Sequence, residues 1–514
     1  MGYCAACRRS GPLGDVPSRV RLLALLLASA CSNGSPPHAG RASADGGGGQ
    51  DATADGAAPE GGSRSDGGSA SDGSSGSDGS SASDSGEVGG DDAGSDGGDL
   101  DAPVPSSSDA APDVDNGMPS TSYPAPHPPL PQLTNALGGR VLTAPTIHLV
   151  VYPGNTDQTT LESFAEHLSA STYWAAATSE YGIGALSYAD TTVLTGETAP
   201  MTIASGDIQT WIAQELARGA FGVPDPQGIY TIVYPSGTTI KQPNPVNTIF
   251  GSVDSCTNFT GYHDSVAVAF DGGATANFVY AVLATCSSID ELTATMSHEW
   301  VEASTDPQDT ADGVFTLTPG PQSAYFSADA DHIVWDVLGM GGEAGDLCQP
   351  EGPSAYFTPP DVGNAVQRTW SNQLAAASHD PCAPDIAGQP FFESAPVLDE
   401  TVAFTSALTG QITTKGVTIP HGQSRTIEVD LFSDAATGGP WTVAADDLLS
   451  KLYGSYGVTK SLSFVWDRTQ GTNGDKLHLT ITVTGASILG GAHAFVVTST
   501  LGARSYAWPG IVVE

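Results

Sequence analysis

A long segment rich in Gly, Ser and Asp limits how much of this chain can fold. Residues 41–120 carry 17 acidic residues against two Arg, and small or polar residues make up most of the remainder. Such a segment cannot bury enough apolar surface to offset the entropy lost on ordering. The sequence therefore predicts a disordered acidic tether over residues 31–131, with a Pro-rich end, and places the folded regions of the 514-residue chain after it.

Residues 1–30 have the pattern of a signal peptide. Two Arg precede the apolar run 22–28, which is followed by small residues and then by Cys31. This run is far shorter than the roughly 20 residues of a membrane-spanning helix. A cysteine at the cleavage point is similar to a bacterial lipobox and predicts lipid attachment at Cys31, whereas ordinary cleavage after Ala30 would release a secreted protein. We expect export, either to the outer membrane or cell surface as a lipoprotein or, otherwise, into the medium.

Two regions of different character follow the tether. In residues 132–385, strands expected at 147–152, 229–234 and 278–284 alternate irregularly with helical patterns, which indicates an α/β or α+β domain. In residues 386–514, apolar and polar side chains alternate along short segments separated by turn signals, as in half-buried antiparallel strands. We expect an immunoglobulin-like β-sandwich there, which is more often an accessory or binding module than a catalytic one.

The motif that carries chemistry lies on a helix in the first of these regions. A capping box that begins at Ser288 predicts a helix from about Ile289. His298 and Glu302 are four residues apart on it, so they project from the same side, as two ligands of one metal ion must. Glu299 directly follows the first ligand, the position of a carboxylate that reaches a metal-activated water. This is the H-E-x-x-H zincin motif with Glu in place of the second His; the alternative is a hydrogen-bonded His/Glu pair on an ordinary helix.

A metal ion on this helix needs a third protein ligand. Asp346 is the first choice, Glu343 the second and His263 the third, because Cys348 fixes the acidic turn that carries the two carboxylates. The other interpretation of Asp346 is a cap of its own turn. With zinc as the metal, the sequence predicts an α+β zincin-like domain over residues 132–385.

Four cysteines lie in the same region. An even number in an exported protein favours disulfides over a metal cage. Three pairings are possible; we expect Cys256 to pair with Cys286 and Cys348 with Cys382, each closing a loop of about 30 residues.

Several segments resemble, in order, the EXORDIUM-like (phosphate-induced) family of plants and bacteria. Members have a similar H-E-x-x-E helix ending in T-N-P or T-D-P, then E-I-x-D-L-C, V-Q-x-x-W and a closing Cys. The matching segments here are 259–263, 297–307, 342–348, 366–372 and Cys382. The resemblance covers roughly residues 140–385, and position 344 is Ala where the family prefers Ile. It implies an exported protein with a zincin-like helix and no particular reaction, since the plant members are associated with cell-wall growth.

These patterns give two functional hypotheses. The first is a zinc-dependent endopeptidase in which His298, Glu302 and Asp346 hold zinc and Glu299 is the general base. The strand at 278–284 would then align an extended peptide by edge pairing. The second is a non-catalytic surface module with a structural metal or a hydrogen-bond network, whose β-sandwich binds protein or cell-surface glycan.

The charge of the chain limits its partners. Its formal net charge is −40 at pH 7, and a field of this sign repels phosphate. We therefore expect no nucleic acid as a partner and contact with membrane only through a lipid anchor. The sequence indicates no oligomeric state.

Overall fold

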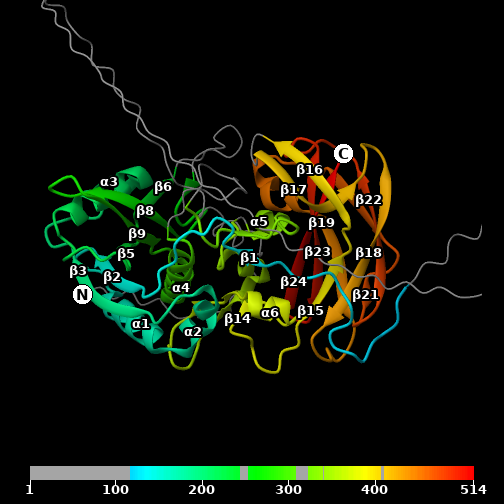
Figure 1. Ribbon diagram of the computed structural model, residues 1–514, viewed down its shortest axis with the longest axis horizontal. Helices are drawn as coiled ribbons and strands as arrows, with labels where there is room; N and C mark the ends of the chain where they lie inside the picture. Colours follow the sequence, from blue (N-terminus) through cyan, green and yellow to red (C-terminus); the bar gives the residue numbers. More distant parts are fainter. Residues whose placement is uncertain (1–115, 243–252, 308–321, 340, 407–409) are drawn as a thin grey trace, which may run out of the picture. The chain divides into compact units, whose positions relative to one another are not determined.

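The computed structural model describes residues 116–242, 253–307, 322–339, 341–406 and 410–514 (Figure 1). The expected signal peptide, Cys31 and most of the expected tether lie outside the described residues. The described chain is a mixed α/β structure with more strand than helix, arranged in several sheets. Within it, no helix is both long enough and apolar enough to cross a membrane.

A five-stranded mixed sheet forms the centre of residues 132–385. Its order is β3-β2-β5-β9-β8, in which β8 runs antiparallel to β9 and the other pairings are parallel. The strands are β2 (Thr146–Val151), β3 (Ser187–Val193), β5 (Gly228–Tyr234), β8 (Gly261–Ala269) and β9 (Thr275–Ala284). The structure thus confirms that the strands expected at 147–152, 229–234 and 278–284 exist.

The place of one strand in the sheet differs from expectation. β9, which contains the segment expected to offer a free edge, pairs with β5 on one side and β8 on the other. The expectation that residues 278–284 align a peptide by edge pairing is therefore wrong. Strand order depends on contacts between distant segments, which local patterns do not encode, and the structure places β8 at the edge.

Helices cover both faces of this sheet (Figure 1). On one face, α1 (Gln158–Ala170) and α4 (Ile289–Thr305) share a core with Leu149 and Val279. On the other face, α3 (Ser205–Ala217) packs against residues such as Tyr280. Because successive side chains of a strand point to opposite faces, the same strands supply both cores.

Shorter elements complete this region. The remaining helices are α2 (Thr172–Thr178), η2 (Ser179–Tyr181), α5 (Val334–Gly339), η3 (Asp346–Ala355) and α6 (Asn372–Ala376). A three-stranded sheet contains β4 (Thr202–Ala204), β6 (Thr239–Gln242) and β7 (Val253–Asp254). Three strand pairs join β1 (Leu133–Thr134) to β10 (Ser327–Ala328), β11 (Tyr356–Phe357) to β12 (Val366–Gln367), and β13 (Thr369–Trp370) to β14 (Cys382–Ala383).

Residues 386–514 form two larger sheets. The four-stranded sheet has the order β15 (Phe392–Pro396), β18 (Ser424–Ser433), β22 (Lys476–Val483) and β20 (Leu462–Trp466). The six-stranded sheet has the order β16 (Glu400–Ser406), β17 (Gly410–Thr418), β24 (Arg504–Val513), β23 (Ala492–Leu501), β19 (Trp441–Asp447) and β21 (Gln470–Gly471). The helices α7 (Leu448–Tyr453) and η4 (Gly454–Tyr456) follow β19. All pairings are antiparallel, as expected, except that β17 pairs with β24 in parallel.

Aromatic side chains connect the two sheets. The rings of Phe392 and Trp441 are 5.4 Å apart, and those of Phe464 and Phe495 are 6.2 Å apart. Each pair joins one strand of the four-stranded sheet to one strand of the six-stranded sheet. The two inner faces therefore enclose a shared core, as in a sandwich.

The end of the expected tether is ordered, which corrects its boundary. Ala125 and Leu130 are 1% and 3% exposed, and the Ala125 N–H donates to Asn473 Oδ1 at 2.9 Å. The imidazole of His127 stacks on Phe432 with the ring centres 3.5 Å apart. A Pro-rich segment loses little backbone entropy on ordering, so a few buried side chains suffice to fix it. The expectation of disorder is thus wrong for the described residues 116–131.

The two folded regions contact each other through buried groups. The Trp335 and Trp508 rings are 5.4 Å apart. Arg368, which is 1% exposed, pairs with Asp380 at 2.9 Å, and Tyr506 from β24 donates to the same carboxylate at 3.1 Å. The core is continuous from one region into the other.

Candidate metal centre

The helix α4 forms as its capping box predicts. The Glu291 N–H donates to Ser288 Oγ at 3.2 Å, and the helix runs from Ile289 to Thr305. Residues 292–305 are all buried, so α4 is surrounded by protein rather than half exposed. Its indole at Trp300 donates to Thr231 Oγ1 in β5 at 2.9 Å, which turns that side of the helix toward the sheet.

The side of α4 that carries the motif meets the acidic turn that precedes η3. His298 Nε2 lies 2.9 Å from Glu302 Oε2 and 3.9 Å from Asp346 Oδ1. The other oxygen of Glu302, Oε1, accepts the backbone N–H groups of Gly345 and Asp346 at 3.1 and 3.0 Å. The structure therefore brings together the three residues that the sequence analysis ranks first as metal ligands.

The two less favoured candidates also lie in this cluster. His263 Nδ1, from β8, is 3.5 Å from Glu299 Oε2 and 3.9 Å from Glu302 Oε2. His263 Nε2 is 3.5 Å from Glu343 Oε1 and 3.3 Å from the carbonyl oxygen of Asp306. The register of β8 against β9 positions this imidazole, and the sequence analysis has no information on that register.

Two groups of three have donor atoms within 4.8 Å of one another. One group is His263, Glu302 and Glu343, and the other is His298, Glu299 and Glu302. Glu302 belongs to both groups, and Asp346 belongs to neither. A third group includes Cys382, but this cysteine is in a disulfide and Arg368 pairs with both acids of that group, so it is not a metal site.

Two glycines allow the close packing of the cluster. A Cβ at Gly345 would lie 2.4 Å from His298 Nδ1, and one at Gly261 would lie 2.6 Å from Thr295 Cγ2 and 3.0 Å from Glu299 Oε1. Real contacts are longer than this, so both positions need the absence of a side chain. The Gly residues before Asp346 and two places before His263 are signals that the sequence analysis did not use.

The two disulfides confirm the expected pairing. Cys348 pairs with Cys382 and Cys256 with Cys286, at sequence separations of 34 and 30. The first links η3, which begins at Asp346, to β14 and so fixes the acidic turn beside α4. Disulfides of this kind are typical of an oxidising compartment, which agrees with export.

The cluster is buried and carries more acid than base. His263, His298, Glu299, Glu302, Glu343 and Asp346 are each no more than 3% exposed. Burial lowers the pKa of the His298 imidazole, but the carboxylates of Glu302, Glu299 and Asp346 outweigh this effect and raise that pKa to about 10. Burial raises the pKa of Glu299. Buried charges need opposite charges close by, and even two protonated imidazoles would not balance four carboxylates.

This donor set fits a divalent metal ion. Imidazole nitrogens and carboxylate oxygens are ordinary ligands of zinc, and a cation would supply the positive charge that the cluster lacks. The Glu299 Oε2 atom is buried and accepts no hydrogen bond within the described part of the chain. A cation at this point would give that oxygen a favourable partner.

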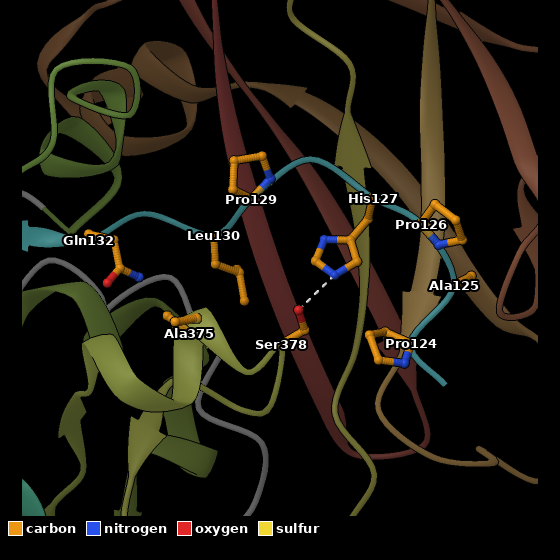
Figure 2. Close-up of a pocket in the computed structure, with 10 residues that line it drawn as sticks. Pro124, Ala125, Pro126, His127, Pro129, Leu130, Gln132, Ala375 and Ser378 are labelled. Carbon is orange, nitrogen blue, oxygen red and sulfur yellow. Dashed lines mark hydrogen bonds between the residues drawn. The ribbon is translucent and has the colours of Figure 1, made fainter. Parts of the chain in front are cut away.

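The described cavities lie elsewhere. Figure 2 shows one of about 660 Å³, lined by most of the segment from Pro124 to Gln132, by the end of α6 and by Ser378. In it, His127 Nε2 lies 3.0 Å from Ser378 Oγ. Another, of about 430 Å³, is lined by residues from both folded regions, including Trp335 and Trp508. The six residues of the cluster line neither cavity.

No protein-family model matches the chain, and no curated protein matches it with significance. The geometry of the cluster and the motif residues are therefore the basis for assigning a function.

Proposed function

We propose that this chain is an exported zinc-dependent endopeptidase with its zinc held on α4. The observation that carries the proposal is the buried cluster of two imidazoles and four carboxylates around Glu302. His298 and Glu302 would hold the ion, with Asp346 as the third ligand. A helix that presents His and Glu at i and i+4, next to a turn rich in acid, is the arrangement of a zincin with one ligand changed.

The residues around the ion have separate roles in this proposal. Zinc, when bound, polarises a carbonyl oxygen and lowers the pKa of water toward neutrality. Glu299 takes the proton of the attacking water and gives it to the leaving amide nitrogen, a task that suits a carboxylate whose pKa burial raises. His263 borders this carboxylate, with its Nδ1 at 3.5 Å from Glu299 Oε2.

The substrate in this proposal is an extended peptide that adds to β8. This strand is at the edge of the five-stranded sheet and carries His263, so a peptide paired with it would pass close to the cluster. Main-chain hydrogen bonds to a sheet edge bind peptides with little regard to sequence. The proposed peptide-binding strand is therefore β8 and not β9, whose two edges are already paired.

The replacement Glu299→Gln tests the mechanism. It removes the proton acceptor and keeps the shape, so hydrolysis of a mixed fluorogenic peptide library should fall by at least about 100-fold. Bound zinc, measured by elemental analysis, should stay unchanged. Glu166→Gln, on the exposed side of α1, is the matched control. Full hydrolysis by the Glu299 variant would contradict the proposed mechanism.

The burial of the cluster favours a second candidate function. With each group no more than 3% exposed, the metal could be structural, and the molecule a non-catalytic surface module that binds protein or glycan through its two-sheet region. Removal of zinc by a chelator would then lower the melting temperature, and the zinc-loaded protein would hydrolyse no peptide. Hydrolysis that Glu299→Gln abolishes would exclude this candidate.

The wider assignments remain part of the proposal. We assign residues 140–385 to an EXORDIUM-like domain with a zincin-like fold, and the sheet with α4 on one face supports this. The order β15-β18-β22-β20 opposite β24-β23-β19 supports an immunoglobulin-like fold for residues 386–514. Export would begin with a signal peptide at residues 1–30, and lipid at Cys31 would anchor the chain; mass spectrometry of the mature N-terminus tests both.

A further inference from the structure

Glu302 lies between two sets of possible ligands. Its Oε2 atom is 2.9 Å from His298 Nε2 and 3.9 Å from His263 Nδ1. The Oε1 atom accepts two backbone N–H groups, so the side chain cannot rotate away without losing both hydrogen bonds. The carboxylate is therefore fixed with one oxygen directed at two imidazoles from different elements, one from α4 and one from β8.

Each imidazole pairs with one carboxylate that the other does not, Asp346 or Glu343, and Glu299 lies near both imidazoles. His298 lies with Glu299 and Asp346, and its donor group of three includes Glu302. His263 lies with Glu343, and its donor group of three also includes Glu302. One ion uses at most part of this set, because four protein ligands complete a tetrahedral zinc site.

The charge of the cluster also indicates two ions. Four buried carboxylates carry four formal negative charges when ionised, which two divalent cations neutralise and one does not. In two-metal sites the ions lie about 3.5–4 Å apart and a shared carboxylate commonly joins them. A single carboxylate oxygen can do this because it has two lone pairs.

We propose that this centre holds two divalent cations bridged by Glu302, one with His298 and Asp346 and the other with His263 and Glu343. The inference rests on the proposed metal binding of α4 and extends it to β8. The second ion would neutralise Glu343. Because it would bind His263, it would also make the position of β8, the proposed peptide-binding edge, depend on bound metal.

Metal stoichiometry of the full chain tests the inference. After loading with zinc and removal of unbound ions, elemental analysis should find two zinc ions per wild-type chain. His263→Gln and Glu343→Gln should each reduce this to one. His332→Gln, at a histidine that pairs with Asp329 and belongs to neither donor group, should leave two and serves as the matched control.

A spectroscopic measurement on the wild-type chain removes the dependence on variants that could misfold. With Mn²⁺ in place of zinc, electron paramagnetic resonance should show the signal of two exchange-coupled ions. A single isolated Mn²⁺ signal, or one zinc per wild-type chain, would overturn the inference. One zinc together with hydrolysis that depends on Glu299 would leave the proposed function intact, whereas no bound metal would remove both.

Discussion

Replacing Gly345 by Ala should disturb the centre through shape alone. The added methyl carbon would lie 2.4 Å from His298 Nδ1, 2.7 Å from His298 Cε1 and 2.8 Å from Glu302 Oε1. Ordinary non-bonded contacts are about 3.5 Å, so the imidazole has to move by roughly 1 Å. Gly345 has φ −75° and ψ −42°, which Ala adopts freely, so backbone strain contributes nothing.

The cost of this movement follows from the burial of its neighbours. His298 and Glu302 are 2% and 0% exposed, so neither can swing into solvent. We expect a loss of about 1–3 kcal/mol in stability, as for other overpacked sites, and a drop of about 10–100-fold in zinc affinity, as when the support of a ligand is lost.

Zinc affinity can be measured by competition with a chromophoric chelator, alongside thermal unfolding. Gly206→Ala is the control, because a Cβ at that position of α3 has no atom within 4 Å and Ala favours a helix. If Gly345→Ala binds zinc within twofold of the control and melts at the same temperature, the assignment of His298 as a ligand is wrong.

Two further predictions concern buried charges outside the centre. Arg368→Ala should lower the unfolding free energy in urea by about 3–5 kcal/mol, because it leaves the buried Glu351 and Asp380 carboxylates without their cation; a loss below 1 kcal/mol would contradict this. Burial raises the pKa of Glu393 to about 8, despite hydrogen bonds from Ser394 N–H and the Ser499 hydroxyl. The folded state therefore keeps a proton that the unfolded chain releases near its ordinary pKa of 4.5. Stability should fall as pH rises from about 4.5 to 8, by at most about 1.4 kcal/mol per pH unit, and Glu393→Gln should flatten this dependence in unfolding experiments across the range.

Local patterns in the sequence predict the elements of the fold better than their arrangement. The capping box at Ser288 gives the first residue of α4, and alternation of apolar and polar residues gives β18 and β22. Helical periodicity runs through residues 160–174, yet the helix is broken at Ser171, whose hydroxyl oxygen accepts the Trp174 N–H and caps the start of α2. The position of β9 inside the sheet follows from pairings with segments far along the chain, so no local pattern could give it.

The site shows the same limit at the level of single residues. Helical spacing alone predicts that His298 and Glu302 face the same way. The acids at 343 and 346 are candidate ligands because they lie in a turn that Cys348 fixes. From the sequence, His263 ranks third among the candidate ligands, behind the two acids of the turn that Cys348 fixes. Its place depends on the register of β8 against β9, where it faces Ala281, and that register is a long-range property.

Glu302 stands at the position of the second His in the H-E-x-x-H motif, and this difference alters what the helix can bind. A second histidine would offer one nitrogen to one ion and would need its other nitrogen held by a neighbour. Glu302 instead uses one oxygen for the N–H groups of Gly345 and Asp346, which fixes the turn against α4. Its other oxygen lies 2.9 Å from His298 Nε2, where the proposed ions would bind. A histidine here would leave the turn without these two hydrogen bonds and the centre without its shared ligand. We therefore expect Glu302→His to bind a single zinc ion, and to bind it more weakly than wild type. Two tightly bound ions in that variant would show that Glu302 is not the bridge.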